Sequence, residues 1–199
     1  MTDEPEEPWR RQQRAALIAA RQTLSSGERK AAADIIGARL TRLTTALQST
    51  TIGIYWPIRN EINLLHWARS LAHNPAVTLC LPVVVIPKEP LEYWRWTPGE
   101  PTRPGVWNIP SPVRRELLMP DLVLAPLVGF DLEKYRLGYG GGYFDRTLAS
   151  SNPRPIAIGV GYDFSALETI FPEPHDIPMH AILTEQREIL PPEWANHAA

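Results

Sequence analysis

Four glycines fall within five consecutive positions of the segment Arg136–Arg146, which reads RLGYGGGYFDR. Glycines spaced this closely let the backbone adopt positive φ angles, so that several N–H groups converge on one point and bind an anion. The apolar run Asp121–Phe130 before this segment has the character of a buried strand, and Tyr143–Ala149 after it can begin a helix. A strand, a glycine loop and a helix in this order are typical of phosphate sites at the carboxyl edge of an α/β sheet.

The loop matches neither of two common nucleotide-binding patterns. Tyr143 occupies the place of the third glycine in GxGxxG, and no Lys-Ser or Lys-Thr pair closes a Walker A loop. A tight turn that lets the chain pass close to a neighbouring element is the alternative to phosphate binding. The flanking residues favour phosphate binding, because Arg136 and Arg146 can pair with phosphate oxygens and Asp145 is the kind of oxygen ligand that Mg²⁺ prefers.

Length and composition indicate one domain without the charge of a general nucleic-acid-binding protein. The 199 residues suffice for a substantial core, and the formal net charge is only −2. Cys80 is the single cysteine, which excludes an internal disulfide and a cysteine metal cluster. No run of about twenty apolar residues occurs, and the acidic start Met1–Glu7 is unlike a signal peptide. We therefore expect a cytoplasmic single domain over 1–199 with frayed ends at 1–8 and 192–199, and no nucleic-acid or membrane partner.

Alternating helical and strand-like segments predict an α/β fold, with a largely parallel, Rossmann-like sheet covered by helices and an N-terminal helical pair. The pair consists of Trp9–Leu24 and a second helix that Ser25 or Ser26 caps and that ends near Leu47. The other expected elements are the strand Ile52–Trp56, the helix Glu61–Leu71, the strands Val77–Val85 and Leu91–Trp96, the loop Gly99–Pro112, and the strands Asp121–Ala125, Ile156–Val160 and Ala181–Thr184. The alternating polarity of Leu91–Trp96 suits an exposed or edge strand.

Arginines on the first predicted helix supply further positive charge. Helical spacing places Arg11, Arg14 and Arg21 on one face, near Arg10. Such a face fits a polyphosphate or another anionic substrate, and a solvated basic surface is the alternative.

A second candidate site follows the strand Ile52–Trp56, at the sheet edge where ligands bind in open α/β folds. Glu61 can accept hydrogen bonds there from an amino-pteridine or a similar ring, on whose face Tyr55 or Trp107 packs. The alternative is a carboxylate that only stabilises a helix N-terminus. In the proline-rich loop near the C-terminus, Asp176 can serve Mg²⁺. Because no Ser–His or Cys–His pattern indicates a nucleophile, we expect positioned phosphoryl transfer rather than covalent catalysis.

Taken together, these motifs resemble the 5-formyltetrahydrofolate cyclo-ligase family, also called methenyltetrahydrofolate synthetases. The resemblance extends over nearly the whole chain, as far as HDIPMHAILTE (His175–Glu185). Its specific stretches are YWPIRNEI (Tyr55–Ile62), WNIPSP (Trp107–Pro112), DLVLAPLVGFD (Asp121–Asp131) and RLGYGGGYFDR (Arg136–Arg146). It implies a monomeric enzyme that uses ATP and Mg²⁺ to convert 5-formyltetrahydrofolate to 5,10-methenyltetrahydrofolate, with release of ADP and phosphate.

The resemblance also implies roles for individual residues. Catalytic roles are implied for Arg136, Tyr143 and Glu61. ATP binding is implied for Arg10, Arg11, Arg14, Arg136, Leu137, Gly138, Tyr139, Gly140, Gly141, Gly142, Tyr143 and Phe144. Folate binding is implied for Tyr55, Glu61, Trp107 and Tyr143, and magnesium binding for Asp145 and Asp176.

The chain departs from the family pattern at three positions. Arg11 stands where a lysine is usual, and His180 where an aspartate is frequent. Lys134 stands where a glycine is frequent, so a positive φ angle there would have a steric cost. Three other functions compete with the enzyme: a non-catalytic folate- or nucleotide-binding paralogue, a different ATP- or NAD-using enzyme with Asp163 as its acidic residue, and a protein-binding module with exposed tryptophans.

Overall fold

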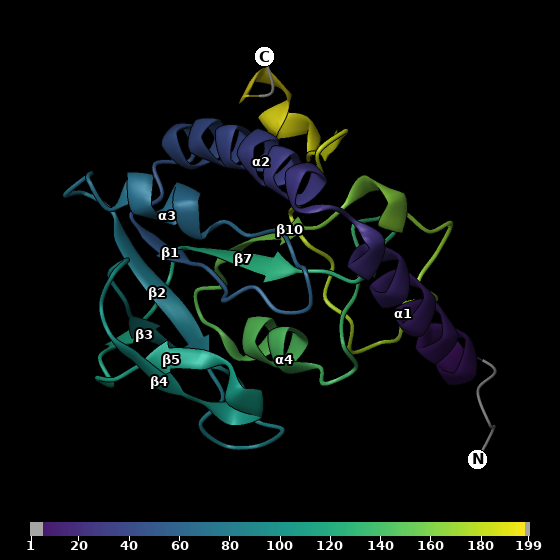
Figure 1. Cartoon of the computed structure of the whole chain (residues 1–199), viewed down its shortest axis with the longest axis horizontal. Helices are drawn as coiled ribbons and strands as arrows, with labels where there is room; N and C mark the ends of the chain where they lie inside the picture. Colours follow the sequence, from purple (N-terminus) through teal and green to yellow (C-terminus); the bar gives the residue numbers. More distant parts are fainter. Residues whose placement is uncertain (1–5, 198–199) are drawn as a thin grey trace.

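A computed structural model describes residues 6–197 and arranges them around one eight-stranded sheet, in the order β12-β11-β10-β7-β1-β2-β3-β6 (Figure 1). Its strands are β1 (Thr51–Gly53), β2 (Thr78–Val83), β3 (Glu92–Arg95), β6 (Leu117–Leu118), β7 (Leu122–Pro126), β10 (Ile156–Val160), β11 (Ala181–Leu183) and β12 (Glu188–Ile189). The five strands from β11 to β2 run parallel. β12 pairs antiparallel with β11, β3 pairs antiparallel with β2, and β6 pairs antiparallel with β3. The expected α/β class with a largely parallel sheet is confirmed.

Four α-helices accompany the sheet within the described range: α1 (Glu6–Thr23), α2 (Ser26–Ala46), α3 (Leu65–Leu71) and α4 (Tyr143–Ser150). Ser25 caps α2 as expected, because its hydroxyl accepts from the Glu28 amide while the Glu28 carboxylate accepts from the Ser25 amide. The two N-terminal helices occupy different positions, since α2 lies across the sheet and α1 projects beyond its edge (Figure 1). Leu17 of α1 packs there against Gly129.

Short elements complete the fold. They are the paired strands β4 (Thr102–Pro104) and β5 (Pro110–Pro112), the paired strands β8 (Gly129–Phe130) and β9 (Arg136–Leu137), and the 3-10 helices η1 (Val106–Asn108), η2 (Asp163–Ser165) and η3 (Pro192–His197).

Two hydrophobic cores lie on opposite faces of the sheet, because successive strand residues point to opposite sides. Leu122 and Leu124 of β7 belong to the core that includes Ile36 of α2. Val123, between them, belongs to the core that includes Leu148 of α4. Figure 1 shows this layering, with α2 and α3 on one side of the sheet and α4 on the other. Burial on both faces explains why the central strands read as continuous apolar runs.

Three expectations about local structure are wrong. The strand predicted at Leu91–Trp96 is not an edge strand, because β6 pairs with its outer side and Tyr93 and Trp94 are buried. The helix predicted to start at Glu61 begins only at Leu65, so Glu61 lies in the loop after β1. The segment Gly99–Pro112 is not wholly irregular, since it contains β4 and β5. In the first case the pairing partner, β6, lies outside the segment, so the local periodicity of Leu91–Trp96 does not reveal it.

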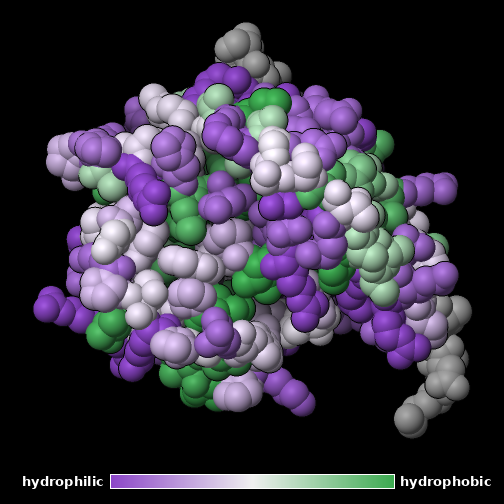
Figure 2. All heavy atoms as spheres, viewed as in Figure 1, coloured by the Kyte–Doolittle hydropathy of each residue, from purple (hydrophilic) through white to green (hydrophobic). Residues whose placement is uncertain are grey.

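The sequence predicted frayed ends at 1–8 and 192–199, but residues 6–8 lie in α1 and residues 192–197 form η3. The other residues of these two segments, 1–5 and 198–199, lie outside the described part of the chain. Within the described range, no helix is both long and apolar enough to cross a membrane. On the face of the molecule shown in Figure 2, hydrophobic residues form separate patches among hydrophilic ones.

Candidate functional site

The glycine loop lies between β9 and α4, beyond the carboxyl end of the central strand β7. Gly140 and Gly142 adopt left-handed conformations, with φ angles of 90° and 61°, and Gly142 is the residue that precedes the first turn of α4. The predicted use of positive φ is therefore confirmed at these two positions. The helix begins at Tyr143, so the positive end of its dipole faces the loop.

Three arginines from three different elements lie directly against alternate glycines: Arg136 against Gly138, Arg14 against Gly140, and Arg146 against Gly142. A Cβ atom on Gly138 would lie only 2.7 Å from Arg136 Nη1, and one on Gly142 would lie 2.8 Å from Arg146 Nη1. The missing side chains thus make room for the guanidinium groups. Three positive charges around backbone amides and a helix N-terminus form a polyanion-binding arrangement.

A buried ion pair joins the two ends of the loop. Arg136 Nη2 donates a 2.8 Å hydrogen bond to Asp145 Oδ2, and the Ile177 amide donates to the other carboxylate oxygen at 3.2 Å. The structure therefore brings Asp145 next to the segment that contains Asp176, as the magnesium prediction requires. Both carboxylates already have an arginine partner, because Arg10 lies 3.0 Å from Asp176.

The arginines of α1 differ in what they contact. Arg14 reaches the loop, where its Nε donates a 3.0 Å hydrogen bond to the Gly138 carbonyl. Arg10 is buried and pairs with Glu173 and Asp176, so its guanidinium links α1 to the C-terminal loop. Arg11 is exposed on the helix surface. The sequence grouped these side chains together, and of the three only Arg14 contacts the glycine loop.

Glu61 forms the second part of the site. Its carboxylate is buried and accepts a 2.9 Å hydrogen bond from the Ile58 amide. Burial raises the pKa of Glu61 to about 7, although the Ile58 amide, the charges of Arg21 and Arg59 and a hydrogen bond from Tyr139 all oppose the rise. Glu61 is thus a carboxyl group that changes charge near neutral pH.

Arg21 is a functional candidate that sequence reasoning missed. The sequence placed it on the basic face of the first helix but assigned it no role in the site. Its buried guanidinium donates hydrogen bonds to the Tyr139 hydroxyl and, at 2.9 Å, to the Arg59 carbonyl. It therefore connects α1, the loop after β1 and the glycine loop. Its helical spacing from Arg14 was the available signal, but the spacing could not reveal a partner 118 positions away.

Tyr55 does not offer a ring face to a ligand, contrary to expectation. Its side chain is buried in the core with residues of α2, and its hydroxyl donates a 2.8 Å hydrogen bond to the Ile62 carbonyl. Through this hydrogen bond, Tyr55 supports the loop that carries Glu61. Because its ring is buried, Tyr55 cannot stack on a ligand, and the direct contact expected from the sequence is wrong.

Trp107 and Tyr143 form the third part of the site. Their rings meet edge to face, with centroids 5.5 Å apart, and Trp107 is 67% exposed. The Arg146 guanidinium lies 5.0 Å from the centroid of the Tyr143 ring. Tyr139 lies in the glycine loop and contacts Glu61, and Tyr143 begins the helix directly after the loop and contacts Trp107. The segment from Tyr139 to Tyr143 therefore joins the Glu61 group to the Trp107 group.

Two departures from the expected pattern have structural explanations. Lys134 has a φ angle of 69°, which confirms the expected steric cost, and its backbone pairs with Asp131 and Met179. His180 accepts a 3.0 Å hydrogen bond from the Ala157 amide through Nδ1 and stacks against Trp194. Burial lowers the pKa of His180, which favours the neutral, accepting imidazole. These contacts place His180 in the scaffold beside β10.

Comparisons with known proteins show which family this chain is similar to. The model of the 5-formyltetrahydrofolate cyclo-ligase family matches residues 6–185. The 5-formyltetrahydrofolate cyclo-ligase of Haemophilus influenzae is 30% identical over 87% of this chain and 96% of its own length. The cyclo-ligase of Mycolicibacterium smegmatis is 30% identical over 90% of this chain and 95% of its own. The structure of Aquifex aeolicus 5,10-methenyltetrahydrofolate synthetase superposes with a TM-score of 0.77 and 29% identity, covering 90% of this chain and 91% of that one.

Proposed function

This chain belongs to the 5-formyltetrahydrofolate cyclo-ligase family, and from that premise we propose that it converts 5-formyltetrahydrofolate to 5,10-methenyltetrahydrofolate with consumption of ATP. The observation that carries the ATP requirement is the set of three arginines packed against alternate glycines of the loop. An uncharged substrate would not need such a concentration of positive charge, whereas a triphosphate does.

The reaction needs activation of an oxygen that is a poor leaving group. Transfer of the γ-phosphoryl group of ATP to the formyl oxygen turns that oxygen into part of a phosphate. N10 of the folate then attacks the formyl carbon, and the carbon–oxygen bond breaks as phosphate leaves. No covalent bond to the protein is required, so its contribution is to align the two substrates and stabilise negative charge.

The loop residues supply the electrostatic part of this proposal. Arg136, which is buried beside Asp145, and Arg14 and Arg146, at the other two glycines, offset the charge of the transferring phosphate. The α4 N-terminus adds backbone amides to the same place. Tyr143 begins that helix and contacts Trp107, and these contacts support a role for Tyr143 between the nucleotide and the folate.

Glu61, Trp107 and Tyr143 are the proposed folate contacts. The Glu61 carboxylate accepts hydrogen bonds from the amino and ring N–H groups of the pteridine, and the exposed Trp107 indole covers an aromatic face. Tyr55 acts indirectly by supporting the Glu61 loop. Deprotonated Glu61 is the better acceptor, so folate affinity rises as the pH passes through about 7.

The proposal also includes a magnesium ion bound together with the nucleotide. Within residues 6–197, no group of three His, Cys, Asp or Glu side chains forms a metal cage. A nucleotide-bound Mg²⁺ needs only one or two protein carboxylates, because phosphates and water supply the other ligands. Asp145 fits this role, since each of its carboxylate oxygens accepts one hydrogen bond and retains a free lone pair. Asp176 is the second candidate, because it directly precedes Ile177, whose amide donates to Asp145. An Mg²⁺ held by Asp145 would supply positive charge beside the phosphates of the nucleotide.

The direct test mixes the purified protein with 5-formyltetrahydrofolate and follows the near-ultraviolet absorbance of the conjugated methenyl product. We expect the band to grow only when ATP and Mg²⁺ are both present, with one ADP formed per product. Binding of folate or ATP without turnover would favour the non-catalytic paralogue instead. A monomeric state and a cytoplasmic location stay predictions, the first of which sedimentation can check.

A further inference from the structure

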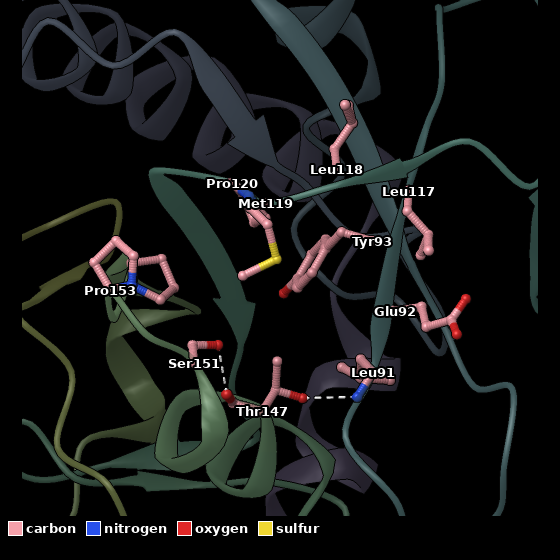
Figure 3. A pocket seen from close by; sticks show the side chains of 11 residues that line it. Leu91, Glu92, Tyr93, Leu117, Leu118, Met119, Pro120, Thr147, Ser151 and Pro153 are labelled. Atoms are coloured by element: carbon pink, nitrogen blue, oxygen red, sulfur yellow. Dashed lines mark hydrogen bonds between the residues drawn. The ribbon is translucent and has the colours of Figure 1, made fainter.

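A cavity of about 220 Å³ has neither Trp107 nor any residue of the glycine loop in its lining. β3, the segment after β6 and the C-terminal half of α4 enclose it (Figure 3). Its walls are chiefly apolar and include Leu91, Leu118, Pro120 and Pro153. None of the proposed ATP, folate or magnesium contacts lines it, so this cavity needs an explanation of its own.

The Tyr93 hydroxyl points into the cavity (Figure 3). Tyr93 is only 5% exposed, and its hydroxyl oxygen has no hydrogen-bond partner among the described residues. A buried hydroxyl without a partner has a free-energy cost, which a phenylalanine in the same place would avoid. Tyrosine at this position therefore indicates a partner that comes from outside the chain.

The Tyr93 ring is held firmly by the central sheet. A Cβ atom on Gly53 of β1 would lie 2.6 Å from the Tyr93 ring, so the ring packs directly on the glycine backbone. Tyr93 also pairs with Pro82 of β2 and Leu118 of β6. Because the ring cannot turn freely, the direction of its hydroxyl is set before any ligand arrives.

The other hydroxyls in the wall are already engaged. Thr147 donates to the Tyr143 carbonyl and accepts from the Leu91 amide, and Ser151 donates to the Thr147 carbonyl. Glu92 is the one charged side chain among the lining residues, and Arg115 pairs with it at 2.8 Å. The cavity thus presents one free hydroxyl and no unpaired cation, which disfavours an anionic ligand.

We propose that this cavity is a binding site for a neutral molecule with a single aromatic ring and one hydrogen-bond acceptor, which receives the Tyr93 hydroxyl proton. The size supports this class, because cavities of about 150 Å³ with apolar walls bind benzene, and the extra volume accommodates one small substituent. Met119, which is 70% exposed, and Leu117 form an open mouth through which such a molecule enters.

The test uses methionine methyl groups as reporters. The chain has three methionines: Met1, Met119 at the cavity mouth and Met179 in the core. In ¹³C-methyl-methionine-labelled protein, acetophenone should shift the Met119 signal in a saturable way, and a Met119→Leu variant assigns that signal. Ethylbenzene, which has the ring but no acceptor, should bind more weakly. Absence of a saturable Met119 shift with acetophenone would overturn the proposal.

Tyr93→Phe separates hydroxyl recognition from simple apolar binding. Loss of one neutral hydrogen bond should weaken acetophenone binding by about three- to tenfold and leave ethylbenzene binding unchanged. The variant should also unfold at a urea concentration at least as high as the wild type, because it removes an unpaired hydroxyl. Equal acetophenone affinity would mean that the hydroxyl does not bind the ligand, and a marked loss of stability would mean that the hydroxyl serves the fold. Either result would refute the proposal.

Discussion

Arg136 and Asp145 face each other across the glycine loop, with Nη2 and Oδ2 2.8 Å apart and both side chains nearly enclosed. The pair joins β9 to α4 and so holds the loop in its curved form. A magnesium ion bound at Asp145, as proposed, would share this carboxylate with the Arg136 guanidinium group. The architecture of the loop and the proposed chemistry therefore depend on the same two side chains.

Removal of one member of this pair should be costly. Asp145→Asn leaves a buried guanidinium without its counter-charge, and we expect a loss of about 3 kcal/mol in the free energy of unfolding, measured with urea. The exposed pair Lys30–Asp34 is the control, and Asp34→Asn should cost less than about 0.5 kcal/mol. Similar small losses in the two variants would show that the Arg136–Asp145 pair does not hold the loop.

Gly140 and Gly99 allow a matched test of the phosphate cradle, since both have positive φ angles, of 90° and 100°. Alanine at either position should cost about 1–2 kcal/mol of stability through backbone strain. Only at Gly140 would the new Cβ approach Arg14, at 3.5 Å from Cζ, whereas at Gly99 it meets nothing within 4 Å. We expect calorimetry to give at least a tenfold weaker ATP affinity for Gly140→Ala alone, and an equal affinity in both variants would argue against the cradle.

Glu61 should make the stability of the protein depend on pH. Folding raises the pKa of Glu61 from 4.5 to about 7, so between these values the folded protein retains a proton that the unfolded chain has released. The free energy of unfolding from this source therefore falls as the pH rises through the window, by about 3 kcal/mol in all.

Glu61→Gln removes this titration while keeping an acceptor for the Ile58 amide. Its stability relative to the wild type should rise between pH 4.5 and pH 7, and above pH 7 it should be the more stable protein. Urea unfolding at several pH values measures the difference. If the two stability curves run parallel across this range, Glu61 does not have a raised pKa.

The Trp107 side chain should contribute to folate binding and contribute little to the stability of the protein. It is exposed, its φ angle is 54°, and its ring contacts Tyr143. Trp107→Ala should change the unfolding free energy by less than about 1 kcal/mol but raise the KM for 5-formyltetrahydrofolate about tenfold.

Phe171 is the matched control, because it is also exposed, has a φ angle of 51° and meets Trp9 edge to face. Phe171→Ala should leave the folate KM unchanged. An unchanged KM in Trp107→Ala as well would exclude the indole from the folate site.

The sequence by itself determined the features that depend on neighbouring residues. The cap of α2 at Ser25, the buried strand β7 and the glycine loop with its positive φ angles follow from local patterns, because φ preferences, capping and strand periodicity act over a few positions. The order of these motifs along the chain is also enough to indicate the family.

Only the tertiary structure decided which distant side chains meet. It directs Arg21 to Tyr139, commits Arg10 to Asp176, and buries Tyr55 where a ligand contact was expected. It also leaves the Tyr93 hydroxyl unpaired over a cavity, in a strand that periodicity assigned to the sheet edge. Several of these contacts join residues more than a hundred positions apart. They depend on strand order and helix packing, which local sequence patterns do not encode.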